Sequence, residues 1–268
     1  MLGQCRDKII LKKKIKQIAQ LVYKSEYAVV MTGAGMSVES GIPPFRGTTG
    51  IWTKYGNPKL DSFSDFKKNP TKWWDDRRNL TIDKHILELR ESLTKAKPHD
   101  GHRSLARIER ARYIKSIITQ NIDGLDLMAG SKNVIEIHGN RKRLRCLGCN
   151  MRVDLDEYIP IYAPDPCKFC GGTVKFDTVL FGEPIPKDIM KISRQEIDKS
   201  DLIIAVGTSA TVRPASGLLW IAKSQGAKII EVNIEKTKLT TISDYYIKSK
   251  AKSFFVNLED ELTSNPDQ

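Results

Sequence analysis

The sequence predicts an α/β fold: a Rossmann-like parallel sheet with helices on both faces, plus a small module that combines a zinc ribbon with a helical insertion. Short apolar runs rich in β-branched residues alternate with helical segments along the chain, which is typical of parallel sheets. The first run ends in a Gly-Ala-Gly turn, as nucleotide-binding βαβ units do. Two Cys-x-x-Cys pairs interrupt the alternation, which indicates an inserted metal-binding module.

Each apolar run ends in a small polar or glycine-rich cluster. Because ligands of open parallel sheets bind beyond the carboxyl ends of the strands, we expect these clusters to meet in one crevice. The spacing of apolar residues predicts the helices that separate the strands. The predicted strands are 27–32, 113–119, 134–137, 201–206 and 228–232, and the predicted helices are 8–26, 106–112 and 214–225.

Residues 43–100 have a different composition, with frequent prolines, glycines and aromatic residues. This composition predicts a mobile loop followed by a small helical insertion that caps a cleft. The end of the chain, 264–268, is expected to be a frayed tail. We expect the large Rossmann-like part to comprise 1–45, 101–139 and 180–268, and the small module to comprise the insertions 46–100 (helical) and 140–179 (zinc ribbon).

Composition and charge exclude several classes of protein. The 268 residues are 40% hydrophobic and 28% charged, which fits a soluble globular protein with a full core. No apolar run approaches a membrane span, and the N-terminus lacks the features of a signal peptide. We therefore expect an intracellular, cytoplasmic protein (nuclear in a eukaryote) with no membrane partner, and a monomer. The net charge of +12 is spread along the chain, so direct nucleic-acid binding is not expected as the primary function.

The cysteines predict a structural zinc site. Cys146 and Cys149 form one Cys-x-x-Cys pair, and Cys167 and Cys170 form the other. This spacing fits a tetrahedral four-cysteine ribbon, and a zinc ion with four protein ligands has no open position for catalysis. Cys5 stands alone before the first predicted helix and is assigned no role.

Three clusters at strand ends carry the chemistry. Backbone N–H groups of the turn 33–35, at the start of a helix, can hold a diphosphate. Gln120, Asn121 and Asp123 offer an amide pair and a carboxylate, although three polar residues at a strand end can also be a plain turn. His138 directly follows a buried-type strand and precedes a glycine, and an imidazole with an ordinary pKa of about 6.5 is suited to act as a base near neutral pH.

Taken together, the motifs resemble those of the sirtuins, the silent-information-regulator family of NAD-dependent protein lysine deacylases. The resemblance covers most of the chain, and its motifs occur in family order. They are the run Gly33-Ala-Gly-Met-Ser-Val-Glu-Ser-Gly-Ile-Pro-Pro-Phe-Arg-Gly47, then 119–123, 129–131, 136–139, the four paired cysteines, 181–183, 207–209, Val212-x-Pro214 and Asn233.

The resemblance implies a single catalytic domain that consumes NAD. The carbonyl oxygen of an acyl-lysine attacks C1′ of the nicotinamide ribose and displaces nicotinamide, which gives an alkylamidate of ADP-ribose. His138 then takes a proton from the ribose hydroxyls, so that the 2′-oxygen attacks the amidate carbon. Water releases lysine and 2′-O-acyl-ADP-ribose. Asn121 is implied as the second catalytic residue, which orders the ribose or a water.

The resemblance also assigns the binding residues. Asp123 is implied to bind the nicotinamide carboxamide, and Phe45 and Arg46 lie in a loop that closes over the ribose. The implied NAD contacts are Gly33, Ala34, Gly35, Ser37, Phe45, Arg46, Gln120, Asn121, Ile122, Asp123, Gly207, Thr208, Ser209, Asn233, Ile234, Glu235 and, beside the adenine, Ala251. The segments implied to sandwich the substrate peptide as an added strand, a mode with weak sequence preference, contain Val179, Leu180, Phe181, Gly182, Glu183 and Val212.

Two positions depart from the family pattern. Pro44 stands where many sirtuins have aspartate, which alters the mobile loop. Asp126 stands where histidine is common, which changes a local packing or hydrogen-bonding partner.

The acyl group and the acceptor are less sharply indicated. Sirtuins that remove succinyl and malonyl groups carry Trp-x-x-Tyr-x-x-Arg, and neither Trp73 nor Trp74 starts that register. Acetyl or a longer neutral acyl group is therefore the default, although Arg77 or Arg78 could reach an acidic one. Two alternatives remain open: transfer of ADP-ribose to protein or solvent through the same NAD site, and a non-enzymatic NAD-sensing scaffold on chromatin or another partner.

Overall fold

A six-stranded parallel sheet forms the centre of the computed structural model, which describes residues 2–57, 62–155 and 166–264. The strand order is β3-β2-β1-β7-β8-β9. Val30 of β1 lies between Ile117 of β2 and Ile204 of β7. The strand order changes direction between β1 and β7, so the crevice for a ligand is expected above that pair. The strands are β1 (Ala28–Thr32), β2 (Ser116–Thr119), β3 (Val134–Glu136), β7 (Leu202–Val206), β8 (Lys228–Asn233) and β9 (Tyr245–Lys248).

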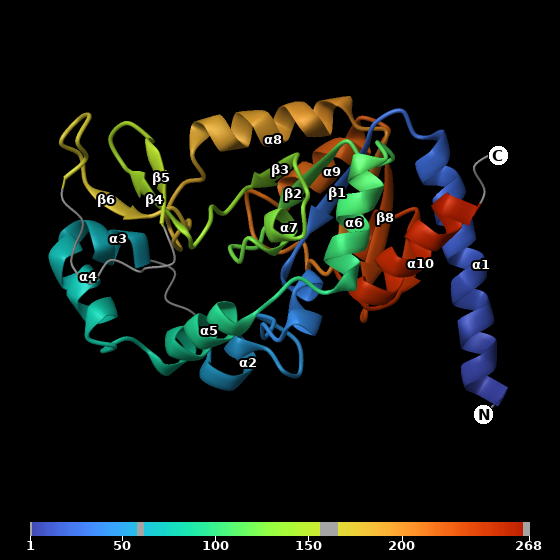
Figure 1. Ribbon diagram of the computed structural model, residues 1–268, viewed down its shortest axis with the longest axis horizontal. Coiled ribbons are helices and arrows are strands. Elements are labelled where there is room, and N and C mark those ends of the chain that lie inside the picture. Colours follow the sequence, from blue (N-terminus) through green and yellow to red (C-terminus); the bar gives the residue numbers. More distant parts are fainter. Residues whose placement is uncertain (1, 58–61, 156–165, 265–268) are drawn as a thin grey trace.

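Helices cover both faces of this sheet (Figure 1). Alternate strand residues belong to different cores: Val30 packs in the cluster that contains Leu105 and Phe254, and Val29 packs in the cluster that contains Leu219. This period of two is what a sheet buried on both faces requires. The fold class predicted from the sequence is confirmed. The first face carries α1 (Leu2–Lys24), α6 (Asp100–Arg110) and α10 (Ala251–Ser264), and the second carries α8 (Lys187–Lys199) and α9 (Gly217–Ser224).

Several predicted element boundaries were wrong. Helix α1 begins at Leu2, so Cys5 lies within it and not before it. Helix α6 begins at Asp100, because the His99 side chain accepts the Gly101 N–H and caps it. The elements α8, β9 and α10 were not predicted, and α10 reaches Ser264, so the rest of the predicted tail lies outside the described residues.

The small module contains the three-stranded antiparallel sheet β5-β4-β6. The Trp74 and Phe176 rings lie 4.7 Å apart, and Trp74 Nε1 donates to the Val174 carbonyl at 3.3 Å, so α4 packs on the ribbon. Leu89 and Leu93 of α5 instead pack in a separate cluster with Ile42 and Leu125. The helical insertion is therefore divided (Figure 1). Its elements are α2 (Ile51–Tyr55), α3 (Ser62–Lys68), α4 (Pro70–Arg78) and α5 (Lys84–Lys95), and the ribbon strands are β4 (Arg143–Cys146), β5 (Arg152–Asp154) and β6 (Val174–Phe176).

The helices that the structure describes can be compared with the requirements for a membrane span. Among residues 2–57, 62–155 and 166–264, no helix has both the length and the hydropathy to cross a bilayer.

Candidate active site

A cavity of about 450 Å³ lies over the carboxyl ends of β1, β2, β7 and β8. It brings together most of the sequence-predicted NAD residues, the predicted base and one predicted peptide contact. Those residues are Gly33, Ala34, Gly35, Phe45, Arg46, Gln120, Asn121, His138, Gly207, Thr208, Ser209, Val212, Asn233, Ile234, Glu235 and Ala251.

Glycines let two loops meet on the floor of this cavity. The Gly35 N–H donates to the Gly207 carbonyl at 2.8 Å, and the Gly33 N–H donates to the Val206 carbonyl at 2.9 Å. A Cβ on Gly35 would lie 2.5 Å from Gly207 Cα, and Gly207 has a φ of +62°. The glycines therefore serve close packing. Of the three amides in the turn, that of Ala34 has no hydrogen-bond partner within the described chain and is the one left for a ligand.

The polar turn after β2 is ordered by a chain of hydrogen bonds. Asn121 Nδ2 donates to the Gly33 carbonyl at 3.0 Å and to Ser37 Oγ at 3.1 Å. Ser37 Oγ donates to Asp123 Oδ2 at 2.7 Å, and Asp123 Oδ1 accepts the Leu125 N–H at 2.9 Å. Burial raises the pKa of Asp123. Ser37, Ile122 and Asp123 do not line the cavity. Of the two polar residues Asn121 and Asp123, only Asn121 therefore faces the cavity.

His138 has one ring nitrogen engaged and the other left for chemistry. Its Nδ1 lies 3.0 Å from the Gln120 carbonyl, which can only accept, so Nδ1 carries the hydrogen and Nε2 is the basic nitrogen. Burial lowers the pKa of His138, although the Gln120 carbonyl acts in the opposite direction. The imidazole is therefore uncharged near pH 7, with Nε2 able to accept a proton. None of His85, His99 and His102 lines the cavity.

Aromatic rings connect the closing loop to the predicted peptide segment. The Phe45 and Trp52 rings lie 5.5 Å apart, the Trp52 and Phe181 rings 5.8 Å apart, and the Arg46 guanidinium is 4.8 Å from the Trp52 ring centre. Trp52 was missed in the sequence, where it was one of many aromatic residues in the insertion. Trp52 lines the cavity together with Phe45 and Arg46, and its ring connects them to Phe181, which lies outside the cavity.

The predicted peptide segment is anchored to its surroundings. The Val179 N–H donates to the His138 carbonyl at 2.8 Å, and the Phe181 carbonyl accepts the Phe63 N–H at 3.0 Å. The Glu183 carboxylate turns away from the cavity, because it accepts the Leu180 N–H at 2.9 Å and pairs with Arg145. Val179, Leu180, Phe181, Gly182 and Glu183 do not line the cavity. Their contact with a substrate peptide stays a prediction. For Glu183 the predicted contact is through its main chain, because its side chain is already engaged.

The four paired cysteines are positioned to bind a zinc ion. Their sulfur atoms all lie within 4.8 Å of one another. A Cβ on Gly172 would lie 3.0 Å from the Cys146 sulfur, and one on Gly148 would lie 3.1 Å from the Cys170 sulfur, so both knuckles need glycine. None of the cysteines lines the cavity, and four thiolates complete a tetrahedral shell, which fits a structural role.

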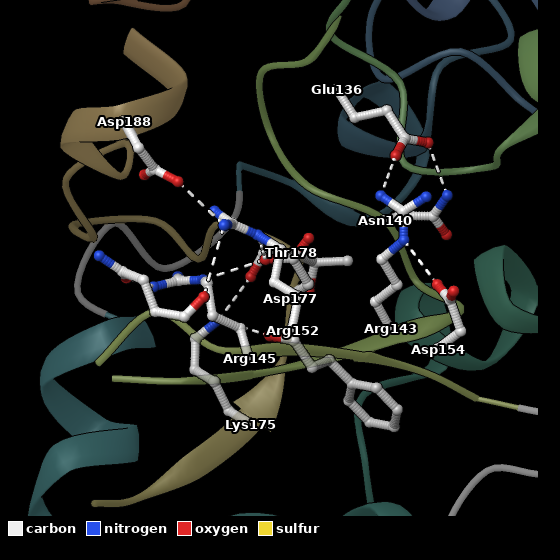
Figure 2. Close-up of polar contacts among 12 residues, drawn as sticks. Glu136, Asn140, Arg143, Arg145, Arg152, Asp154, Lys175, Asp177, Thr178 and Asp188 are labelled. Atoms are coloured by element: carbon white, nitrogen blue, oxygen red, sulfur yellow. Dashed lines mark hydrogen bonds and ion pairs between the residues drawn. The ribbon is translucent and has the colours of Figure 1, made fainter. Parts of the chain in front are cut away.

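Buried charges join the ribbon to the rest of the molecule (Figure 2). Glu183 pairs with Arg145 and, at 3.1 Å, with Lys175, and burial lowers the pKa of Lys175 to about 8. Asp177 lies 3.0 Å from Arg145 Nε and 3.2 Å from Arg152 Nε. We call these five residues the ribbon charge network. Arg152 extends it to α8, because Asp188 lies 3.0 Å away.

Comparison with known proteins gives one consistent result. The family model described as the Sir2 family matches residues 33–214. The NAD-dependent protein deacylase 1 of Archaeoglobus fulgidus is 39% identical over 236 residues, which cover 88% of this chain and 93% of the relative. A solved Sir2 homologue variant in complex with 2′-O-acetyl-ADP-ribose is 36% identical, with a TM-score of 0.77 and coverage of 94% and 98%. A Sir2 homologue–NAD complex is 37% identical, with a TM-score of 0.76 and coverage of 92% and 93%.

Proposed function

The chain belongs to the Sir2 family, and we propose that it is an NAD-dependent protein lysine deacylase. It converts acyl-lysine and NAD into lysine, nicotinamide and 2′-O-acyl-ADP-ribose. One observation carries this proposal: His138, whose Nε2 is the nitrogen not engaged by Gln120, lines the same cavity as the glycine turn, Asn121 and the closing loop. A solved relative of the same fold holds 2′-O-acetyl-ADP-ribose.

The residues of the cavity fit NAD as a co-substrate. The Ala34 amide is free for a diphosphate oxygen, and Asn233 Nδ2 is bound to the Thr208 carbonyl at 3.2 Å, which holds the β7 and β8 loops together at the adenosine end. Phe45 and Arg46 sit over the other end, beside Trp52. NAD supplies the electrophilic C1′ carbon and the ribose hydroxyls that accept the acyl group.

His138 and Asn121 have distinct roles in this proposal. His138 Nε2 accepts a proton from a ribose hydroxyl, because its Nδ1 hydrogen is fixed on the Gln120 carbonyl. The Asn121 amide nitrogen is already bound to Gly33 and Ser37, so its carbonyl oxygen is the atom left to order a ribose hydroxyl or a water. Asp123 lies behind Asn121 and Ser37, so its action on the nicotinamide end requires a rearrangement of that hydrogen-bonded turn.

The second substrate is an acylated lysine within a protein. The Val179 N–H is bound to the His138 carbonyl, so a backbone hydrogen bond ties the predicted peptide segment to the base. Acetyl or a longer neutral group remains the proposed acyl group. We also propose a monomer and a cytoplasmic location; four zinc-binding thiols favour a reducing compartment.

The test is a direct assay of the products. The wild type, His138→Ala and Asn121→Ala are incubated with NAD and acetyl-, myristoyl- or succinyl-lysine peptides, and mass spectrometry follows nicotinamide and O-acyl-ADP-ribose. Loss of a general base lowers the rate of acyl-ADP-ribose formation roughly 10²–10⁴-fold, and His138→Ala is expected to keep the folded state. ADP-ribose on protein without O-acyl-ADP-ribose would favour the transferase, and no nicotinamide release with any peptide would favour the scaffold.

A further inference from the structure

Asp126 is a buried carboxyl group directly behind the candidate active site. It is 3% exposed and lies in the first turn of α7 (Leu125–Met128), which follows the polar turn of Asn121 and Asp123. Its Oδ1 atom has no hydrogen-bond partner within the described residues. An unpaired carboxylate oxygen in such a site is costly, whereas a protonated carboxyl is much less so.

A hydrogen-bond chain links Asp126 to the active-site turn. Thr119 Oγ1 accepts the Thr32 hydroxyl at 2.8 Å and the Asn121 N–H at 3.1 Å. These two donors occupy the acceptor positions of the Thr119 hydroxyl, so its own hydrogen is directed to a third group. That group is the Asp126 carboxyl, on which the Thr119 side chain and, more weakly, the Thr32 side chain act. Asp126 therefore acts on the Asn121 backbone through one intervening residue.

The charges around Asp126 oppose its ionisation. Asp123, from the loop after β2, and Glu136, from β3, both face it with negative charge. The nearby cations stabilise the charges of Glu136 and Asp123. Arg143 pairs with Glu136 at 2.7 Å, and the charge of Arg141 favours the ionised form of Asp123.

Helix α6, which packs against α7, brings two charged groups to this side. Its Glu109 carboxylate is held by the Lys132 and Asn133 N–H groups, and Arg110 Nη2 approaches Gly130. Burial, and after it the charge of Asp123, raises the pKa of Asp126 to about 7.

We propose that Asp126 is a positioning residue of the NAD site, and that its proton keeps the turn of Asn121 and Asp123 in the geometry that directs Asn121 toward the cavity. With the proton in place, the neutral carboxyl accepts the Thr119 hydroxyl and adds no charge behind Asp123. When the proton passes to solvent, a second negative charge lies beside Asp123 in a buried site, and binding at the nicotinamide end weakens. This inference rests on the proposed function.

The test compares pH profiles of three variants with that of the wild type. Asp126→Asn copies the neutral carboxyl, Asp126→Ala removes the acceptor, and Thr119→Val removes the relay hydroxyl. Asp244→Asn is the matched control, because it removes a carboxylate that pairs with Lys223 beside β8. The KM for NAD and the kcat are measured with one acyl peptide from pH 5.5 to 9.5.

We expect the wild-type KM for NAD to rise above neutral pH and to exceed that of Asp126→Asn roughly fivefold to tenfold at pH 9. Asp126→Ala and Thr119→Val should raise KM at every pH, whereas Asp244→Asn should follow the wild type. A purely structural role would not give a pH-dependent difference that the conservative variant removes. Parallel profiles for Asp126→Asn and the wild type would overturn the proposal.

A second readout does not depend on activity. Asp126 has a pKa near 7 when folded and near 4 when unfolded, so the native state binds the extra proton between these values. Wild-type stability should therefore fall relative to Asp126→Asn as the pH rises from 4 to 7 and then level off. Thermal unfolding at several pH values measures this. If the pH-dependent difference in stability appears but no acyl-ADP-ribose forms at any pH, the proposed function is wrong, although Asp126 is protonated in the folded state. If the difference in stability is absent, the inference on Asp126 is wrong.

Discussion

The cavity over the sheet and the junction of the ribbon are held together by opposite means. At the cavity, Gly35 and Gly207 bring two backbones into contact, and neutral hydrogen bonds fix Asn121 and His138. At the junction, Lys175 and Glu183 are buried with their charges. The sheet has large apolar clusters on both faces, whereas a three-stranded ribbon is too small for a core of its own. The cavity therefore depends on shape, and the ribbon on a metal and on balanced charge.

Removal of the zinc ligands should produce the largest effect. In Cys149→Ser the site loses a thiolate, and metal binding contributes on the order of 10 kcal/mol to the folding of small zinc modules. We expect loss of bound zinc, fast amide exchange across β4–β6 and loss of peptide deacylation, because Val179 and Gly139 connect the ribbon to His138. Exchange in β1, β7 and β8 should change little. Cys5→Ser is the control. Equal protection of the β4–β6 amides from exchange in both variants would contradict the prediction that the ribbon depends on its metal.

The ribbon charge network should give the next effect. Glu183→Gln leaves Arg145 and Lys175 with one carboxylate, that of Asp177, and an uncompensated buried charge costs about 3–5 kcal/mol. Urea unfolding measures the loss of stability. The double variant with Lys175→Met removes one surplus cation and should recover part of it, and a double-mutant cycle gives the coupling. Additive losses would mean that the two side chains are not coupled.

Much of this contrast was visible in the sequence. The alternation of apolar runs, the glycine turn and the cysteine spacing are local signals, so the sheet, the cavity and the zinc site could be predicted. His138 could be singled out because a strand precedes it directly. Helix α10 also has a local signal, since Phe254, Phe255, Leu258 and Leu262 share one buried face.

The remaining features depend on tertiary contacts. Arg145 and Glu183 are 38 positions apart in the chain, so no local pattern shows that Glu183 turns inward. Asp126 was recognised as a departure from the family pattern, yet its burial and its neighbours come from tertiary contacts, because the pairing of β2 with β3 places Thr119 beside Glu136. Trp52 became a site residue because Phe45 and Phe181 meet around it.

The smallest effect is expected where the same kind of charge pair lies on the surface of the sheet part. Arg107 of α6 holds Glu259 of α10 through two nitrogens, one at 2.7 Å, but the Arg107 side chain is 51% exposed. Glu259→Gln should therefore cost no more than about 1 kcal/mol. The hydrogen bond from Arg107 lowers the pKa of Glu259. The contribution of this pair to stability is therefore present above the unfolded-state pKa and disappears as the pH falls through the folded-state pKa.

Urea unfolding with and without 1 M salt distinguishes the surface pair from the ribbon charge network, because salt should remove the effect of Glu259→Gln and leave that of Glu183→Gln. Equal salt sensitivity would mean that the ribbon charges are not shielded from solvent.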